Sequence, residues 1–490
     1  MSRTQEVFWG STWYFIGAML AAGVAYLTKL VLVRTLTVEE FGLFFAVFTF
    51  VLFFTIFRSI GLNQGLARFI AEYSLTKRFS QIKSLIVGSA LLQLIVSSLI
   101  VIILWSLAPW LAENYFGSPK AVLLLRLMAL YLPLMILVSN TRAALQGFKI
   151  TYWYSFSEFA SNLFVLILVG LALIIGLGMY SAAIGYLGSI IIFYIIFGSV
   201  VNKKTKILSY KQKDFFSENK KLVLFSLPLV LTGAGAVIIS YFDTLMLTYF
   251  DTLANVGVYN IIYPSAMILA LVGSSIGTIL LPVVTQMWTS KKKKEIGKAL
   301  ETIYTYIFAS SLIVVVILAI FSEELLGLFF GSEYAVGATA FSVLLIAAIL
   351  STIITVNNQI LVAIKKPRQT MRVYVVGSVA NIILNVALIP SYSLLGAALA
   401  TIISFLIMVL MSLYYVREGI PINIPVKKIL LCFVSVATIP FIISQTMILL
   451  NIHIYASAII SSVVAATVYF LLLMLLKVIN VQEVLSMYKK

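Results

Sequence analysis

Apolar runs of about 20 residues, the length that an α-helix needs to cross a bilayer, recur along the whole chain. About 14 such windows can be read, from 7–33 near one end to 455–477 near the other. Hydrophobic residues make up 62% of the sequence and charged residues 10%, against about 25% charged residues in an ordinary soluble domain. The sequence therefore predicts an all-α polytopic membrane protein with about 14 transmembrane helices. It excludes a soluble globular enzyme.

Lysine and arginine are distributed unevenly over the loops between these windows. If the N-terminus is cytoplasmic, the inner segments contain all but five of the 34 cations, and the segment 203–221 is the richest of them. Cytoplasmic loops of membrane proteins collect cations in this way. We therefore interpret the net charge of +17 as a sign of orientation, not of nucleic-acid binding. We expect a multi-pass protein of the cell membrane with both termini in the cytoplasm.

Short segments recur later in the chain at a common offset of 214 to 216 residues. EEFGLFFAV at 39–47 returns as ANVGVYNII at 254–262, and YFGSPKAV at 115–122 returns as FFGSEYAV at 329–336. Each half holds six helices, so both halves enter the membrane in the same direction, as parallel repeats. The predicted parts are an N-terminal lobe (1–202), a cytoplasmic linker (203–220), a C-terminal lobe (221–416), and helices 13 and 14 with a cytoplasmic tail (417–490).

Several kinds of chemistry have no basis in this sequence. The chain has no GxxxxGK[ST] phosphate loop and no cytoplasmic segment long enough for a nucleotide-binding domain. Cys432 and His453 are the only residues of their types, which excludes an intramolecular disulfide, a CxxC site and a histidine cluster for a metal. We expect a protein without catalytic residues, cofactor or metal. A membrane enzyme of glycan assembly is opposed by the short loops.

Two cations fall deep within predicted spans, where a charge at the helix centre costs about 2.5 to 3.5 kcal/mol. These are Lys29 in the first span and Arg58 in the second, and their counterparts in the repeat are the uncharged Thr244 and Ser274. Cations present in one half only indicate an anionic ligand that is held asymmetrically. The alternative is that both residues form structural ion pairs.

Four further charges lie in or near the spans. Arg34 and Arg126 are nearer the outer surface, where they either assist in binding the substrate or extend to lipid headgroups. Glu158 opens a span on the inner side, where it has either a coupling role or a helix-dipole role. Asp243 is the one deep acid of the second half. It forms a gating salt bridge with Lys29, the preferred interpretation, or it titrates or binds a cation during transport.

Three stretches carry a resemblance to a known family: RTLTVEEFGLFF at 34–45, SIGLNQGLARFIAEY at 59–73 and YFDTLMLTYFDTLANVGVYNIIYPS at 241–265. They resemble the Wzx-type flippases, the polysaccharide-transporter branch of the multidrug/oligosaccharidyl-lipid/polysaccharide (MOP) exporter superfamily. The resemblance implies the fold of this superfamily. It also implies the non-enzymatic movement of a polyprenyl-phosphate- or diphosphate-linked oligosaccharide to the outer leaflet.

The resemblance also implies roles for particular residues. Lys29 and Arg58, with Arg34 and Arg126, match the family's cationic cavity, and Asp243 matches an acidic position. The implied partners are the lipid-linked oligosaccharide, membrane lipids, a proton or sodium ion, and other glycan-assembly proteins. The sequence lacks the dense arginine cluster of the lipid II flippases, which argues against a peptidoglycan precursor as cargo. The alternative is a cation-coupled multidrug exporter, for which a cavity dominated by acids is expected.

The charge distribution predicts the topology directly. A tag inserted within residues 203–221 should be protected from a membrane-impermeant reagent in intact cells, while a cysteine introduced by Glu323→Cys should be labelled. Cys432 is first replaced by serine to remove background labelling. The opposite labelling pattern would overturn the predicted orientation.

Overall fold

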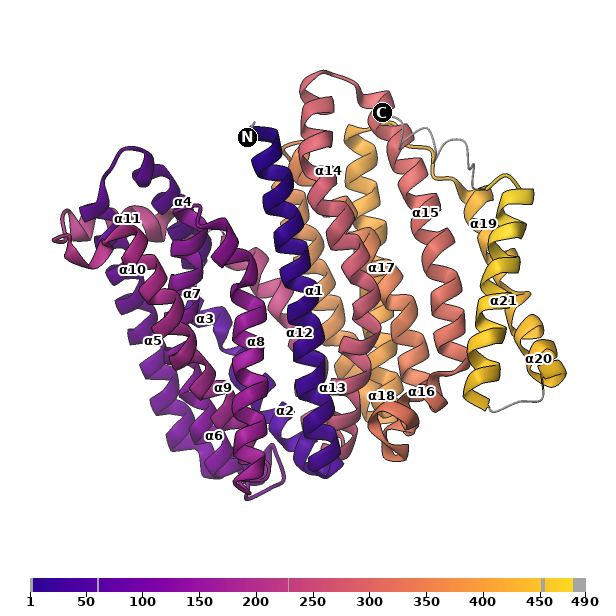
Figure 1. The fold of residues 1–490 in the computed structure, drawn as a ribbon, viewed down its shortest axis with the longest axis horizontal. Coiled ribbons are helices and arrows are strands. Elements are labelled where there is room, and N and C mark those ends of the chain that lie inside the picture. Colours follow the sequence, from indigo (N-terminus) through magenta and orange to yellow (C-terminus); the bar gives the residue numbers. More distant parts are fainter. Residues whose placement is uncertain (1–2, 60, 228, 451–453, 479–490) are drawn as a thin grey trace. The chain divides into compact units, whose positions relative to one another are not determined.

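The computed structural model describes residues 3–59, 61–227, 229–450 and 454–478, and every regular element in these ranges is helical (Figure 1). The described residues contain 13 helical segments that are long and apolar enough to cross a membrane. One of them, Pro367–Gly419, consists of two helices merged across a kink at Ser393. Counting it as two agrees with the predicted number of spans, and the predicted all-α polytopic fold is confirmed. His453 lies outside the described residues.

The chain divides into two compact units, the first of which comprises residues 1–261 and 385–393. Within it, α1 packs along α8, α8 along α9, α4 against α7 and α2 against α12. The elements of this unit up to α12 are α1 (Arg3–Thr35), α2 (Val38–Phe53), α3 (Thr55–Ser59), α4 (Leu62–Leu75), α5 (Phe79–Asn114), α6 (Ala121–Ala129), α7 (Tyr131–Gly147), α8 (Thr151–Ile174), α9 (Tyr180–Phe193), a π turn η1 (Tyr194–Gly198), α10 (Ser199–Thr205), a 3-10 turn η2 (Ile207–Ser209), α11 (Phe215–Ser226) and α12 (Leu229–Phe250).

The second unit comprises residues 262–384 and 394–490. Within it, α14 packs along α17, α15 against α17 and α19, and α20 along α21. The first turns of α13 and a short piece of α18 belong to the first unit. The elements from α13 onward are α13 (Leu253–Met267), a 3-10 turn η3 (Ile268–Ala270), α14 (Leu271–Thr289), α15 (Lys293–Ile320), α16 (Ser322–Phe330), a 3-10 segment η4 (Ser332–Gly337), α17 (Ala338–Ala363), α18 (Pro367–Gly419), α19 (Val426–Val436), α20 (Ile439–Leu450) and α21 (Ile454–Leu475).

Helix boundaries follow the offset of the sequence repeat. α1 ends at Thr35 and α12 at Phe250, while α2 begins at Val38 and α13 at Leu253, so both pairs of boundaries are 215 residues apart. The caps also repeat. The hydroxyl of Thr37 accepts a hydrogen bond from the backbone N–H of Glu40 (3.2 Å). In the same way, the hydroxyl of Thr252 accepts one from the N–H of Asn255 (3.3 Å). A side-chain oxygen at this position satisfies one of the free N–H groups of the first helical turn.

The span predicted over 41–62 is present as Val38–Arg58 but contains a short interruption. α2 ends at Phe53, a short helix α3 follows, and α4 begins after Gly61, whose φ of 67° lies in the left-handed region. Glycine adopts this conformation without a steric penalty, so the chain can change direction here. The equivalent span of the second half is also interrupted, because α13 passes through the turn η3 before α14 begins. Both halves therefore break the same helix at matching positions.

Residues with a left-handed backbone occur at many helix ends, and lysine is frequent among them on the predicted cytoplasmic side. In turns predicted to face the cytoplasm they include Lys77, Lys149, Lys206, Lys291, Lys365 and Lys477. In turns predicted to face outward they include Gly117, Gly176, Gly178 and Gly331. A cation close to a helix C-terminus interacts favourably with the partial negative charge there. The lysines can therefore stabilise helix C-termini in addition to setting the orientation of the protein in the membrane.

The segment predicted as a cytoplasmic linker is held against the first unit. The ammonium of Lys83 donates to the backbone carbonyls of Leu208 (2.7 Å) and Tyr210 (2.5 Å). On α11, the buried carboxylate of Glu218 accepts from the phenol of Tyr73 (2.5 Å) and pairs with Lys221 (2.8 Å). Burial raises the pKa of Glu218, but the hydrogen bonds from Lys221 and Tyr73 outweigh it and hold that pKa below its ordinary value. The linker is thus a docked part of the unit.

The backbones of α2 and α13 approach each other closely at two glycines. A Cβ atom on Gly42 would lie 1.8 Å from the carbonyl oxygen of Leu253, and one on Gly257 would lie 2.7 Å from that of Val38. Val38 and Leu253, like Gly42 and Gly257, are equivalent positions of the repeat. A reciprocal contact of this kind is what a two-fold relation produces close to its axis. The contact supports two parallel repeats.

This approach predicts a specific intolerance of side chains. Gly42→Ala should lower the free energy of unfolding by about 1 to 3 kcal/mol, because the methyl group collides with backbone that cannot rotate away. The matched control is Gly170→Ala in α8, where an added Cβ meets nothing within 4 Å. This control should be neutral or stabilise the helix by up to about 1 kcal/mol. Denaturant unfolding in detergent measures both variants, and equal stability of the two would contradict the close contact.

Candidate functional site

Lys29 lies on α1 and contacts two other helices of the first unit. Its ammonium donates to the backbone carbonyl of Asn260 on α13 at 2.7 Å, and it lies 4.9 Å from the centre of the Phe45 ring on α2. A carbonyl oxygen and an aromatic face both attract a cation without neutralising it. The Lys29 ammonium therefore lies among α1, α2 and α13, with a carbonyl oxygen and an aromatic ring as its contacts.

Asp243 lies on α12, and its side chain is 2% exposed. One carboxylate oxygen accepts from the phenol of Tyr259 at 2.6 Å, and the other accepts from the amide of Asn385 at 2.5 Å. Tyr259 is the residue that precedes Asn260 on α13, so consecutive residues of one helix connect Asp243 and Lys29. The structure shows the Lys29 ammonium against the Asn260 carbonyl. The gating salt bridge with Asp243, preferred from the sequence, stays a prediction.

Arg58 lies on α3, immediately after the interruption of the second span, and is 2% exposed. Its guanidinium donates to the side-chain oxygen of Gln93 on α5 at 3.2 Å. The Gln93 amide in turn donates to the hydroxyl of Ser89 (3.0 Å) and to the side-chain oxygen of Asn140 on α7 (3.3 Å). The Nε atom of Arg58 is buried and has no hydrogen-bond partner within the described ranges. α3 packs against α12, the helix of Asp243.

The other three predicted site residues are exposed. Arg34 lies in the last turn of α1 and Arg126 in the last turn of α6, where a cation complements the helix dipole. The backbone carbonyl of Arg126 accepts a hydrogen bond from the Trp105 indole at 2.9 Å. Glu158 is exposed on α8. The structure thus connects Lys29 with Asp243, places Arg58 on a neighbouring helix, and leaves these three at the surface of the first unit.

Sequence reasoning missed Arg142, which was counted among the cytoplasmic cations. It is half-buried on α7, where its guanidinium donates to the carbonyl of Ser157 (3.3 Å) and lies 5.6 Å from the centre of the Phe193 ring. Its Nε atom is buried without a partner in the described part of the chain. The run Ser139, Asn140, Thr141 and Arg142 at the end of an apolar window was the available signal. Because the run stands at the end of an apolar window, it is equally typical of the start of a cytoplasmic loop.

The arrangement favours anion binding over metal binding. Lys29 and Arg58 have neutral partners, a carbonyl and a carboxamide, so their charge remains available to a ligand. Within the described ranges, no three His, Cys, Asp or Glu side chains come together in a group that could hold a metal ion. A cation within the membrane that has no carboxylate partner costs free energy. Such a cation is therefore a sign of a functional site.

These features define a multi-pass α-helical membrane transporter, because interrupted helices that carry charge within the membrane form substrate sites in such proteins. The sequence model of the polysaccharide biosynthesis protein family matches residues 7–288, which is more than half of the chain. The protein belongs to this family. A second family model, MatE, matches residues 228–387.

Individual relatives agree with this assignment. An uncharacterized membrane protein of Methanocaldococcus jannaschii is 27% identical over 510 residues, which cover 100% of this chain and 99% of that protein. A probable low-salt glycan biosynthesis flippase of Haloferax volcanii, Agl15, is 26% identical over 53% of this chain and 56% of its own length. Among solved structures, a lipid II flippase in an inward closed conformation shares the fold, with a TM-score of 0.74, 18% identity, and coverage of 93% of this chain and 97% of that one. The predicted place in the flippase branch of the MOP superfamily is confirmed, and the protein is a transporter, not an enzyme.

Proposed function

We propose that the protein moves a polyprenyl-phosphate- or polyprenyl-diphosphate-linked oligosaccharide from the inner to the outer leaflet by alternating access between its two halves. Such a cargo has long apolar tails that do not leave the bilayer and a charged, hydroxyl-rich head that does not cross hydrocarbon unaided. A cationic path within a helical bundle lowers the barrier for the head while the tail stays in lipid. The similarity to the probable low-salt glycan biosynthesis flippase of Haloferax volcanii supports this cargo class.

The buried guanidinium of Arg58 is the single observation that carries the proposal. It sits next to the interruption in the second span, and the equivalent span of the second half is interrupted as well. Paired interruptions in corresponding helices are a sign of a substrate site in transporters built from repeats. A phosphate group can form charge-assisted hydrogen bonds with a guanidinium whose present partner is a neutral amide.

Other charged residues receive roles along the same path. Lys29 binds the anionic head together with Arg58, and Arg34 and Arg126 bind it near the outer ends of their helices. Asp243 couples transport to a proton or sodium ion, and its carboxylate accepts hydrogen bonds from Tyr259 and Asn385. Glu158, exposed on α8, has a secondary coupling role at the inner surface.

The cellular setting follows from the same proposal. The protein acts in the cell membrane with both termini in the cytoplasm, as the distribution of lysine and arginine indicates. Its partners are the lipid-linked oligosaccharide, membrane lipids and other glycan-assembly proteins, without nucleic acid.

A cation-coupled exporter of small organic cations is the second candidate. The observation in its favour is the MatE match over 228–387, which includes the buried Asp243. Such a cargo requires an anionic site. The half-buried Lys29 and the buried Arg58 oppose it by repulsion.

The main test removes one cation at a time. In proteoliposomes, Lys29→Ala or Arg58→Ala should slow the translocation of a fluorescent polyprenyl-diphosphate-linked disaccharide by about 10- to 100-fold, because each loses a charge-assisted hydrogen bond. Lys29→Thr and Arg58→Ser, which introduce the residues of the other half, should have the same effect. Translocation is measured as the loss of fluorophore accessible to an external quencher.

The matched control is Lys298→Gln, which removes an exposed lysine of α15 and should leave the rate unchanged. Normal rates for both Lys29→Ala and Arg58→Ala would refute the cationic site. Ethidium uptake without movement of the lipid-linked sugar would favour the multidrug exporter instead.

Asp243 gives a separate prediction. If it couples transport to an ion, Asp243→Asn should abolish the response of the translocation rate to an imposed pH or sodium gradient. Binding of the lipid-linked sugar should be retained, because asparagine keeps the size of the side chain. The charge swap of Asp243→Lys with Lys29→Asp should remain inactive. Recovery in the swap would instead support the gating salt bridge, and a normal gradient response in Asp243→Asn would remove the coupling role.

A further inference from the structure

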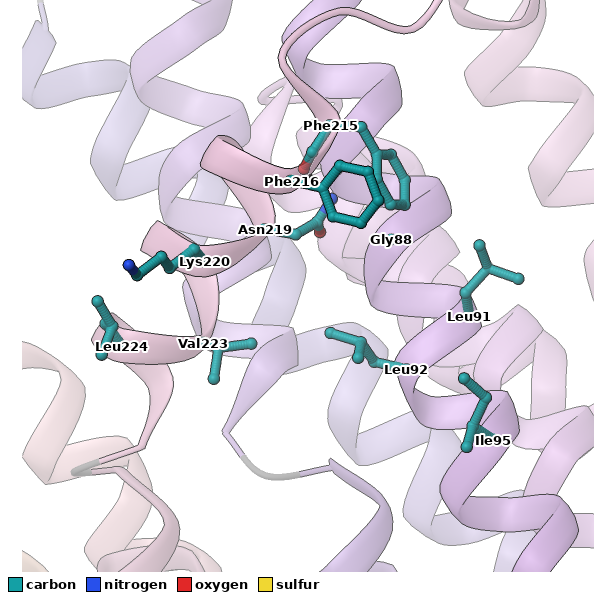
Figure 2. A pocket seen from close by; sticks show the side chains of 10 residues that line it. All are labelled: Gly88, Leu91, Leu92, Ile95, Phe215, Phe216, Asn219, Lys220, Val223 and Leu224. Atoms are coloured by element: carbon teal, nitrogen blue, oxygen red, sulfur yellow. Dashed lines mark hydrogen bonds between the residues drawn. The ribbon is translucent and has the colours of Figure 1, made fainter.

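A groove of about 460 Å³ lies between α5 and α11 (Figure 2). One wall is formed by Leu91, Leu92 and Ile95 of α5, and the other by Val223 and Leu224 of α11. This volume falls within the range of about 300 to 1,000 Å³ that is usual for small-molecule sites. Its walls are almost entirely apolar.

The groove faces the lipid. α5 is a candidate membrane span over its whole length, and Ile95 on its groove side is 67% exposed. α11 is not among the candidate spans, yet it exposes Phe216 to 87% together with Leu224. Exposed aromatic and aliphatic side chains on a helix that also carries lysines are typical of a helix at the membrane surface. The groove therefore runs from the membrane surface into the hydrocarbon region.

Polar groups are concentrated at one end of the groove. Asn219 is 7% exposed, and its amide donates to the backbone carbonyls of Ser84 (3.1 Å) and Phe215 (2.8 Å). Its side-chain oxygen is buried with no hydrogen-bond partner in the described part of the chain, so it can accept a donor from a ligand. Lys220, the next residue, is exposed and lines the rim.

The side chain of Asn219 needs the space that a glycine leaves. In Figure 2 it lies between α11 and Gly88 of α5. A Cβ atom on Gly88 would lie 2.1 Å from both terminal atoms of the Asn219 amide. The polar end of the groove is thus defined by a close fit of the two helices.

We propose that this groove binds an anionic two-chain lipid of the surrounding membrane. One hydrocarbon chain lies between Leu92 and Val223, the phosphate is attracted by Lys220, and a headgroup hydroxyl donates to the free oxygen of Asn219. The lysines of the preceding segment, among them Lys211 and Lys213, add attraction for an anionic membrane surface.

The observations favour a resident membrane lipid over the transported lipid. α11 is fixed to the first unit through Glu218 and Tyr73, and the preceding segment is fixed through Lys83. The groove is therefore a permanent feature of this unit. α11 leads directly into α12, the helix of Asp243, so the bound lipid supports the start of that helix. This site does not depend on the identity of the transported cargo.

Native mass spectrometry of the purified protein tests the proposal, with phosphatidylglycerol and phosphatidylcholine as probes. The wild-type protein should retain phosphatidylglycerol preferentially. Leu92→Trp fills the groove and should abolish this retention, whereas Leu94→Trp, an exposed leucine of α5 outside the groove, should not. Lys220→Gln should lower the preference by about fivefold, as expected for one lysine at an anionic surface. Lys298→Gln is its control.

Two results would overturn the proposal. The first is equal retention of phosphatidylglycerol by Leu92→Trp and Leu94→Trp. The second is retention of a polyprenyl phosphate in preference to phosphatidylglycerol by the wild type, with neither lipid retained by Leu92→Trp, which would assign the groove to the cargo. Both readouts are binding measurements, so the result is independent of translocation.

Discussion

The contact of α2 and α13 at Gly42 and Gly257 is the constraint on which the candidate site depends. Two helices can touch backbone to backbone only where both lack a side chain, and each glycine faces the carbonyl at the start of the other helix. This approach places the beginning of α13 beside α2. The carbonyl of Asn260 thereby comes within reach of Lys29, which also lies over Phe45 of α2. A side chain at either glycine would separate the helices and remove a partner from the cation.

The half-buried Lys29 and the buried Arg58 and Asp243 have neutral groups among their partners. Lys29 is held by a carbonyl and an aromatic ring, Arg58 by a carboxamide, and Asp243 by a phenol and a second carboxamide. Neutral donors and acceptors lower the cost of burying a charge without cancelling it, whereas a buried ion pair is strongly destabilised when one partner leaves. A transporter that binds and releases a charged head requires the first arrangement. The observed partners are therefore consistent with a site that cycles between occupied and empty states.

The sequence predicted those features that rest on periodicity and composition. The spans follow from apolar runs, and the repeat follows from the shared offset of segments such as 39–47 and 254–262. The break at Phe54 was not predicted, because the residues around it are apolar and continue the helical pattern. Docking of the linker was also missed, since it depends on hydrogen bonds from Lys83 to carbonyls 125 and 127 residues away. Contacts of this range leave no local pattern in the sequence.

Comparison of equivalent positions separates the residues that maintain the fold from those that confer function. The glycines of the close contact and the threonine caps at 37 and 252 are the same in both halves, as a shared backbone geometry requires. Lys29 has no charged equivalent, since Thr244 occupies its place in the second half and is buried. A membrane protein built from two similar halves tolerates a charge in one half only if a ligand or a local partner offsets the free-energy cost of that charge within the membrane. The local partners of Lys29 and Arg58 are neutral, so they offset only part of the cost of placing these charges in the membrane. A ligand can offset the rest, and because both residues are cations, we expect that ligand to be an anion.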